Sequence, residues 1–227
     1  MARIKGEWID ESSIALKQSS YVDAWMSKDL KKFKIENSDI FLKNGELKAE
    51  YRLAEEIIKQ IKKDTMFMKY IGGKHQKIMT GTISNITVKI TIDSLHHTCI
   101  TDLKIIKDMD LIWNEKTKQK ENFIDYYKYT LQASLYQEIV RQRTGKKLPF
   151  IIAVATKEKY SQRQLLQIPQ DIMDEKLEFL KSYLPHLQDV KTGKVEPTSC
   201  GKCPYCISKK KCEKIYYYDE YFNERNK

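Results

Sequence analysis

The chain has 227 residues, carries a formal net charge of +10, and is 41% hydrophobic and 11% aromatic. This length and apolar content are enough for a folded domain with a hydrophobic core, and they exclude a disordered chain. No run of about 18 apolar residues occurs, which excludes a membrane-spanning helix, and the first residues lack the hydrophobic region of a signal peptide. The excess of positive charge suits a polyanionic partner, nucleic acid first.

Two segments near the start are predicted to be helical, residues 12–35 and residues 47–62. The second is the clearer of the two, because its apolar residues return at helical spacing. The first has an irregular apolar stripe that contains the acidic residue Asp23. After a glycine turn, residues 77–82 are expected to form a strand that leads into the next segment.

The stretch from Ile83 to Ile106 reads as two strands rich in Ile, Val and Thr, separated by a polar turn near residues 94–97. Side chains alternate between the two faces of a strand, so Asp102 and Lys104 project from the same side. If the two strands pair as a hairpin, Asp93 on the first lies near Asp102 on the second. The sequence therefore predicts two carboxylates and one ammonium at one place on a sheet.

This group of charges has a chemical use. Two carboxylates can hold Mg²⁺ and leave open positions for water and phosphate, and the metal then acidifies the water and neutralises charge on the phosphate. An ammonium can orient or deprotonate that water. A salt bridge on a solvated strand face is the competing interpretation, since short patterns often arise by chance. The second carboxylate, and a following helix with polar residues on one face, favour the metal site.

Beyond the hairpin we expect a polar loop, a helix and two strands. The loop covers residues 107–120 and includes Trp113, which we expect to be a packing anchor. The helix covers residues 121–143, and its Gln132 and Tyr136 stand at positions i and i+4, hence on one face. The two strands that follow are residues 148–156, a continuous apolar run typical of a buried strand, and residues 164–168.

A last helix is predicted over residues 174–183. We expect it to stop at Pro185, because proline lacks the backbone N–H that a helix interior requires. The polar residues that follow read as a linker. The chain is therefore predicted to have three parts: a core of residues 1–185, a linker of residues 186–199, and a cysteine-rich segment of residues 200–227 packed on the core.

Four of the five cysteines, Cys200, Cys203, Cys206 and Cys212, follow a C-x₂-C-x₂-C-x₅-C pattern. Such close spacing is typical of thiolate ligands in a reducing compartment and not of a disulfide framework, so the cytoplasm is the expected location. The metal is either Zn²⁺ or the iron of a [4Fe-4S] cluster, and the spacing leaves this choice open. The fifth cysteine, Cys99, is expected to be a small core residue.

The combination of Asp93 with Asp102-Leu103-Lys104 resembles the core motif of the PD-(D/E)XK nuclease superfamily. The run from Gln132 to Tyr136 resembles the Gln-x-x-x-Tyr motif of its RecB-like and RecE-like branches. Within them, the chain is similar to the phage and prophage exonucleases related to RecE (exonuclease VIII), over residues 4–212. Further segments that look like this group are Ser20–Trp25, Gly45–Glu50 and Cys200–Cys206.

The resemblance implies a restriction-endonuclease-like α/β fold, in which helices flank a central mixed sheet of about four or five strands. It implies that Asp93, Asp102 and the backbone carbonyl of Leu103 hold Mg²⁺, or Mn²⁺ in its place. Asp23 is a candidate further ligand, since relatives carry a metal-holding residue in this region. A carboxylate on a helix surface explains Asp23 equally well.

The resemblance also suggests roles for the remaining polar residues of the motifs. Lys104 would position and activate the water, and Gln132 and Tyr136 would support the site. The cysteines resemble the C-terminal half of an iron–sulfur clasp in RecB-like nucleases, where a further cysteine comes from the N-terminal end. Here Met1 is expected to begin partway into that domain, so Cys200 would replace the upstream ligand or the clasp would be incomplete.

The expected function is a Mg²⁺-dependent exonuclease of the phage recombination type, which hydrolyses phosphodiester bonds from duplex DNA ends. Similarity to RecE implies a phage or prophage origin in a bacterial host, 5′ to 3′ digestion, a ring-shaped homo-oligomer and a single-strand annealing partner. Two other functions stay open. One is a catalytically inert DNA-binding module with a structural metal, favoured by Thr82 where relatives carry an acidic residue. The other is an endonuclease, or a nuclease acting on RNA, with the same site.

Overall fold

A computed structural model describes residues 2–3, 5–9, 12–212 and 215–218 of the protein. The chain divides into two compact units, which we call the core unit, Glu11–Gln188, and the terminal unit, Met1–Asp10 with Asp189–Lys227. The end of the predicted cysteine-rich segment, residues 219–227, lies outside the described residues.

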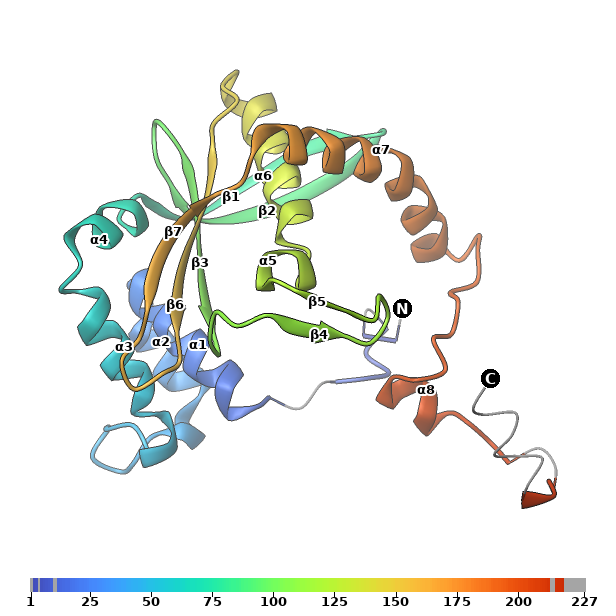
Figure 1. Ribbon diagram of the computed structural model, residues 1–227, viewed down its shortest axis with the longest axis horizontal. Helices are drawn as coiled ribbons and strands as arrows, with labels where there is room; N and C mark the ends of the chain where they lie inside the picture. Colours follow the sequence, from blue (N-terminus) through green and yellow to red (C-terminus); the bar gives the residue numbers. More distant parts are fainter. Residues whose placement is uncertain (1, 4, 10–11, 213–214, 219–227) are drawn as a thin grey trace. The chain divides into compact units, whose positions relative to one another are not determined.

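Five strands form the central sheet of the core unit, in the order β1-β2-β3-β6-β7 (Figure 1). All neighbours are antiparallel except β3 and β6, which run parallel, so the sheet is mixed as predicted. Every residue of β6 is buried, in agreement with its continuous apolar run. The strands are β1 Lys74–Ile83, β2 Ile86–Leu95, β3 Ile100–Ile106, β6 Phe150–Thr156 and β7 Arg163–Gln167.

A small separate hairpin replaces part of the loop expected at residues 107–120. It consists of β4, Ile112–Asn114, paired antiparallel with β5, Gln119–Glu121. Trp113 lies on β4 with 49% of its surface exposed, so the expectation that it is a packing anchor is wrong. Its indole N–H donates to Glu115 Oε1 at 2.9 Å, which satisfies the polar edge of the ring without burying it.

The two faces of the central sheet carry separate apolar clusters, as the alternation of side chains along a strand requires. On β3, Leu103 and Ile105 belong to one cluster, whereas Ile100 and Ile106 belong to the other. Helices α1 to α4 cover the first face and α6 covers the second (Figure 1). The helices of the core unit are α1 Ile14–Met26, α2 Leu30–Glu36, α3 Leu53–Ile61, α4 Thr65–Ile71, α5 Phe123–Tyr126, α6 Tyr129–Thr144 and most of α7 Gln170–Thr192.

The first two predicted helices exist, with different bounds. Residues 12–35 form two helices, because Lys28 adopts the left-handed conformation (φ 64°) that commonly terminates a helix. Ser13 caps the first of them by accepting a hydrogen bond from the Leu16 N–H at 3.1 Å. The second predicted helix begins later than expected, at Leu53, and is preceded by the 3₁₀ turn Ala49–Tyr51.

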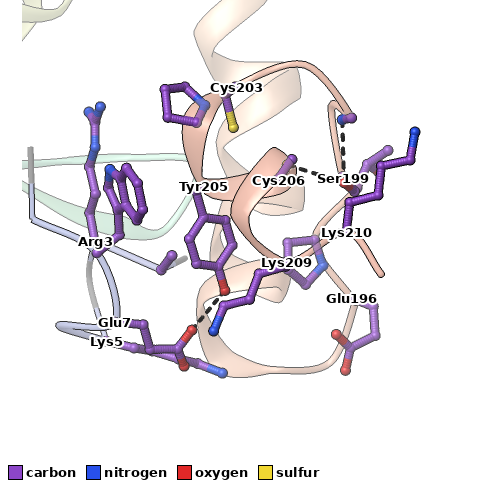
Figure 2. Close-up of a pocket in the computed structure, with 16 residues that line it drawn as sticks. Arg3, Lys5, Glu7, Glu196, Ser199, Cys203, Tyr205, Cys206, Lys209 and Lys210 are labelled. Atoms are coloured by element: carbon purple, nitrogen blue, oxygen red, sulfur yellow. Dashed lines mark hydrogen bonds between the residues drawn. The ribbon is translucent and has the colours of Figure 1, made fainter. Parts of the chain in front are cut away.

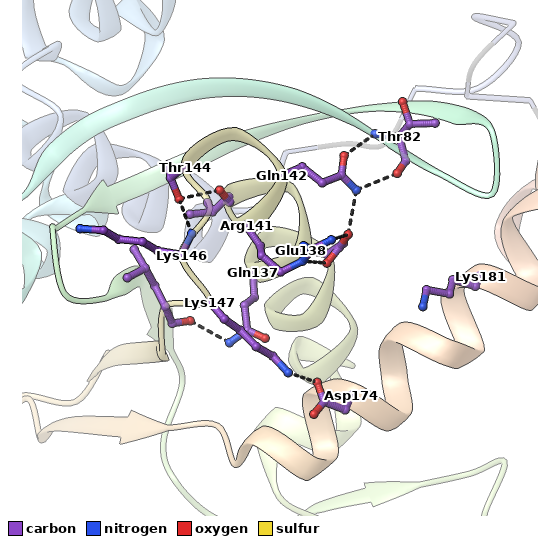
Figure 3. Close-up of polar contacts among 12 residues, drawn as sticks. Thr82, Gln137, Glu138, Arg141, Gln142, Thr144, Lys146, Lys147, Asp174 and Lys181 are labelled. Carbon is purple, nitrogen blue, oxygen red and sulfur yellow. Dashed lines mark hydrogen bonds and ion pairs between the residues drawn. The ribbon is translucent and has the colours of Figure 1, made fainter.

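The C-terminal half of α6 is fixed to β1 by close packing and by an amide clamp. A Cβ atom at Gly81 would lie 2.7 Å from Ile139 Cδ1 and 2.6 Å from Gln142 Oε1, so any larger residue would require these two side chains to shift. Gln142 accepts from the Thr82 N–H at 2.9 Å and donates to the Thr82 carbonyl at 2.8 Å. Gln142 also donates a hydrogen bond to Glu138, as Figure 3 shows. The helix that carries Gln132 and Tyr136 is therefore held rigidly against the sheet.

The last long helix extends well beyond the predicted stop. Helix α7 runs from Gln170 to Thr192 and contains Pro185, so the expectation that Pro185 ends the helix is wrong. Only Met173 of this helix is buried. The backbone carbonyl that proline leaves without a partner can therefore be hydrated, which lowers the penalty for proline inside the helix. The first residues of the expected linker are consequently helical.

In the described part of the chain, none of the helices combines the length and the apolar character that a bilayer span requires.

Candidate active site and cysteine cluster

The predicted hairpin forms, and its ladder ends where the two aspartates stand. Strands β2 and β3 pair through Ser94 with Thr101 and through Leu95 with Ile100. The next step in this register places Asp93 opposite Asp102. There the Leu103 N–H donates to Asp93 Oδ2 at 3.2 Å, so a carboxylate takes the place of the next backbone partner. The strands separate at this point and leave room for side chains between them.

Asp102 is the most buried acid of the site, with 2% of its surface exposed. Its Oδ1 accepts a hydrogen bond from Gln132 Nε2 at 2.7 Å. Its Oδ2 lies 2.5 Å from Lys104 Nζ. The two groups form a close ion pair. The predicted convergence of Asp102, Lys104 and Gln132 is therefore present in the structure.

Asp23 reaches the same place from helix α1. The hydroxyl of Ser19, one turn earlier, donates to the Ile105 carbonyl at 3.3 Å, which holds α1 against β3. The charges of Lys104 and Asp102 both act on the Asp23 carboxyl. We call Asp23, Asp93 and Asp102, with Lys104, the acidic cluster.

Burial sets the protonation of the acidic cluster. It raises the pKa of Asp93 to about 7, and repulsion from Asp102 and Asp23 adds to the effect. Burial likewise raises the pKa of Asp23 to about 7 and raises the pKa of Asp102. Three adjacent carboxylates cannot all ionise beside a single ammonium, so the site is short of positive charge. A divalent cation would supply it.

Lys104 remains a cation in this environment. Burial, the largest single effect, favours the neutral amine, but the charge and hydrogen bond of Asp102 and the charges of Asp93 and Tyr129 together outweigh it, so the pKa of Lys104 is raised. Its Nζ also lies 4.8 Å from the centre of the Tyr129 ring. Cation–π attraction therefore adds to the ion pair.

Helix α6 presents its predicted polar face to the carboxylates. Gln132 contacts Asp102 directly, as described above, and also bonds the hydroxyl of Tyr136. The Tyr136 ring packs edge-on against Phe150, with centroids 6.1 Å apart, and burial raises its pKa. Tyr136 therefore contacts Gln132, and the charges of Asp102 and Lys104 also act on it.

Two residues near the acidic cluster have no part in the sequence motifs. Lys157 follows directly on β6, and its charge acts on Asp23. Its ammonium donates to the Ala15 carbonyl at 2.8 Å, and burial lowers its pKa. Tyr129 lies under Lys104 at the start of α6. Lys157 could have been identified from the sequence as a lysine at the end of a buried strand. Tyr129 could not, because several tyrosines stand on the same helix and none is distinguished by the pattern.

The cysteines of the terminal unit gather more tightly than the carboxylates. Among the described residues, Cys200, Cys203 and Cys206 alone form a group of at least three His, Cys, Asp or Glu whose ligand atoms lie within 4.8 Å of one another. We call these three the cysteine cluster. The fourth predicted ligand, Cys212, lies outside it.

The cysteine cluster is built by a few neighbouring residues. Cys203 caps the short helix α8, Pro204–Ser208, and its N–H donates to Cys200 Sγ at 3.3 Å. The Ser199 hydroxyl donates to Cys206 Sγ at 3.2 Å, and this bond is the largest of the effects that lower the pKa of Cys206 to about 6. A thiolate at neutral pH is the form that binds Zn²⁺ or iron. The three residues could therefore hold a metal.

A cavity of about 1020 Å³ adjoins the cysteine cluster (Figure 2). Cys203 and Cys206 line it together with basic side chains that include Lys5 and Lys209. Across the cavity, Tyr205 on α8 donates its hydroxyl hydrogen to Glu7 at 2.9 Å. The two ends of the chain are thus joined within the terminal unit.

The chain is similar to a known protein family and to a solved structure. The family model for a PDDEXK-like domain of unknown function (DUF3799) matches residues 1–209. The crystal structure of a candidate exonuclease from Eubacterium rectale is similar, with a TM-score of 0.89 and 38% sequence identity, over 97% of this chain and 84% of that one. No curated protein matches at a significant level. These findings confirm the predicted superfamily and fold class, and they support a nuclease.

Proposed function

The chain belongs to the PDDEXK-like family DUF3799, and we propose on this premise that it is a Mg²⁺-dependent exonuclease acting on duplex DNA ends. The observation that carries the proposal is the environment of Asp102. A buried carboxylate lies beside one ammonium and one amide, opposite a second carboxylate, at the point where two strands separate. A structural salt bridge does not need the second acid, whereas a metal site does.

The residues fit a divalent cation. Asp93 and Asp102 would hold it with the Leu103 carbonyl, and Asp23 would contribute from α1. Asp102 is buried and contacts the Lys104 ammonium and the Gln132 amide, so a cation beside it would share the carboxylate with Lys104. When bound, Mg²⁺ or Mn²⁺ would acidify a water and offset the charge that develops on the phosphate.

The remaining side chains would position the reactants. Lys104 would position and activate the attacking water and attract the phosphate. Gln132 donates to Oδ1 of Asp102 and so fixes the orientation of this carboxylate. Tyr136 keeps Gln132 in this orientation.

The preference for duplex DNA ends rests on two supports. The Eubacterium rectale relative is named as a candidate exonuclease, and the net charge of +10 suits a polyanionic substrate. By resemblance to RecE, we further propose a phage recombination role in the bacterial cytoplasm. A homo-oligomer and a single-strand annealing partner belong to the same proposal.

The proposal is tested by incubating linear and closed-circular duplex DNA with the protein and Mg²⁺, with and without EDTA. We expect loss of linear DNA alone, abolished by EDTA. Cutting of circles would instead indicate an endonuclease, and binding without loss of either DNA would indicate an inert module. Lys104→Ala should abolish turnover and spare DNA affinity. Lys107→Ala, which removes a lysine with 94% of its side chain exposed, should change neither.

A further inference from the structure

Three tyrosines meet at the junction of α5 and α6. Tyr127 stacks on Tyr129, with centroids 5.7 Å apart and an interplanar angle of 30°. Tyr126 meets Tyr127 edge-on, with centroids 5.0 Å apart. Tyr127 nevertheless keeps 52% of its surface exposed. The junction therefore offers an aromatic ring that is supported by its neighbours and still open to solvent.

This ring is connected to the acidic cluster through one residue. Tyr129, which carries Tyr127 on its stacked side, also lies 4.8 Å from Lys104 Nζ. The ring centre of Tyr127 therefore lies no farther from Lys104 Nζ than the sum of the Tyr127–Tyr129 and Tyr129–Lys104 distances. Since bases along a DNA strand rise by about 3.4 Å each, a phosphate at Lys104 leaves the neighbouring bases within reach of Tyr127.

The backbone between the two rings is held in an uncommon conformation. Lys128 adopts φ 59° and ψ 37°, in the left-handed region that residues other than glycine rarely occupy. Its surroundings hold it there: Asn122 caps α5 by accepting from the Asp125 N–H at 3.0 Å, and Phe123 packs edge-on against Tyr129. This turn brings Tyr127, the residue after α5, face to face with Tyr129, the first residue of α6. As at Lys28, this left-handed residue ends one helix and lets the chain turn into the next.

We propose that Tyr127 is a stacking platform for an unpaired base of the nucleic-acid strand whose phosphate lies at Lys104. The inference deepens the proposed nuclease function and rests on it. Aromatic rings bind bases of any sequence, because every base has a π-face. An isolated exposed tyrosine would carry no such meaning. The ring of Tyr127 differs because it is stacked, braced and placed next to the catalytic ammonium.

The test uses DNA with a single-stranded end that carries the fluorescent base 2-aminopurine, added to the full chain in EDTA so that binding is observed without turnover. We expect the wild-type protein to change the 2-aminopurine fluorescence. Tyr127→Ala should abolish this change and weaken binding by about 5- to 150-fold. Tyr127→Phe should retain both, because the stacking ring is kept.

Two controls separate stacking from a loss of folding. Tyr160→Ala removes a tyrosine that is 77% exposed elsewhere in the core unit and should leave both readouts unchanged. DNA that lacks the terminal bases should bind wild type and Tyr127→Ala equally, because the ring then has no base to contact. A Tyr127→Ala defect of the same size on both DNAs, or no defect at all, would overturn the proposal.

The nuclease assay distinguishes this proposal from the one on which it rests. Base-dependent fluorescence that requires Tyr127, in a protein that degrades no DNA, would support the platform and refute the nuclease. Degradation of DNA with unchanged fluorescence in Tyr127→Ala would refute the platform and support the nuclease.

Discussion

The acidic cluster and the cysteine cluster both gather metal-ligating side chains, yet they are built in opposite ways. Asp102 is buried on β3, Asp93 is half-buried on β2, and Asp23 joins them from a helix far away in the chain. Cys200 and Cys206 stand within one short segment, and Cys200 is exposed. Burial raises the pKa values of the carboxyls, whereas a local hydroxyl lowers that of the Cys206 thiol. One site depends on the fold, and the other depends on its immediate neighbours.

The most severe effect is expected from Asp102→Asn in the acidic cluster. The change keeps the size of the side chain and an acceptor for Gln132, but removes the charge opposite Lys104. Nuclease activity on linear duplex should fall by about 1,000-fold or more, while the thermal melting curve stays that of a folded protein. Asp108→Asn, on an acid outside the site, should retain full activity. Activity of Asp102→Asn within a few-fold of wild type would contradict the assigned role.

In the cysteine cluster we expect the second largest effect, on metal content. Cys203→Ser replaces a thiolate by a weaker ligand and should lower metal affinity by about 100-fold. Metal analysis and the visible absorption spectrum of anaerobically purified protein measure the loss and identify the metal. Cys99→Ala, at a buried cysteine outside the cluster, should keep the metal. If Cys203→Ser retains its metal fully, the cluster is not the binding site.

The raised carboxyl pKa values predict how stability depends on pH without metal. The folded-state pKa of Asp93 is about 7, above the ordinary 3.8, so its contribution to stability is present at low pH and is lost as pH rises through 7. Asp93→Asn should therefore stabilise the EDTA-treated protein at pH 8, by roughly 2–4 kcal/mol, and change little at pH 4. Thermal melts at both pH values measure this difference.

Mg²⁺ should stabilise the wild-type protein at pH 8 more than at pH 5, because the carboxylates bind it only when ionised. Equal stabilisation at the two pH values would show that the ion binds elsewhere.

The smallest effect is expected at the packing of α6 on β1. Gly81→Ala places a methyl group 2.6 Å from Gln142 Oε1 and should lower the free energy of unfolding by about 1–3 kcal/mol. Gln142→Ala removes one of the two clashing groups, so the double variant should lose less stability than the two single losses added together. Strict additivity in chemical denaturation would show that the contact is not tight.

Much of the site could be predicted from the sequence because its parts are local. Strand alternation placed Asp102 and Lys104 on one side, the hairpin brought Asp93 opposite, and helical spacing put Gln132 and Tyr136 on one face. These relations follow from the geometry of single elements and of adjacent strands. The resemblance to PD-(D/E)XK nucleases rested on the same residues, which is why the family model and the structure agree with it.

Other relations depend on packing between elements distant in the chain. Asp23 approaches the acids because α1 docks on β3, and Lys157 is nearby because β6 runs parallel to β3. The stack of Tyr127 on Tyr129 depends on one left-handed residue that no periodicity reveals.

The local sequence pattern thus determined which side chains share a face of a strand or helix. It brought together the two acids and the lysine of the hairpin, and it grouped the first three cysteines. The tertiary structure alone decided that Asp23 lies near Asp102, that Lys157 lies near Asp23, and that Cys212 is not grouped with the other cysteines. The physical reason is the range of the forces. Backbone geometry relates residues a few positions apart, whereas burial and charge act on whatever the packed helices bring together.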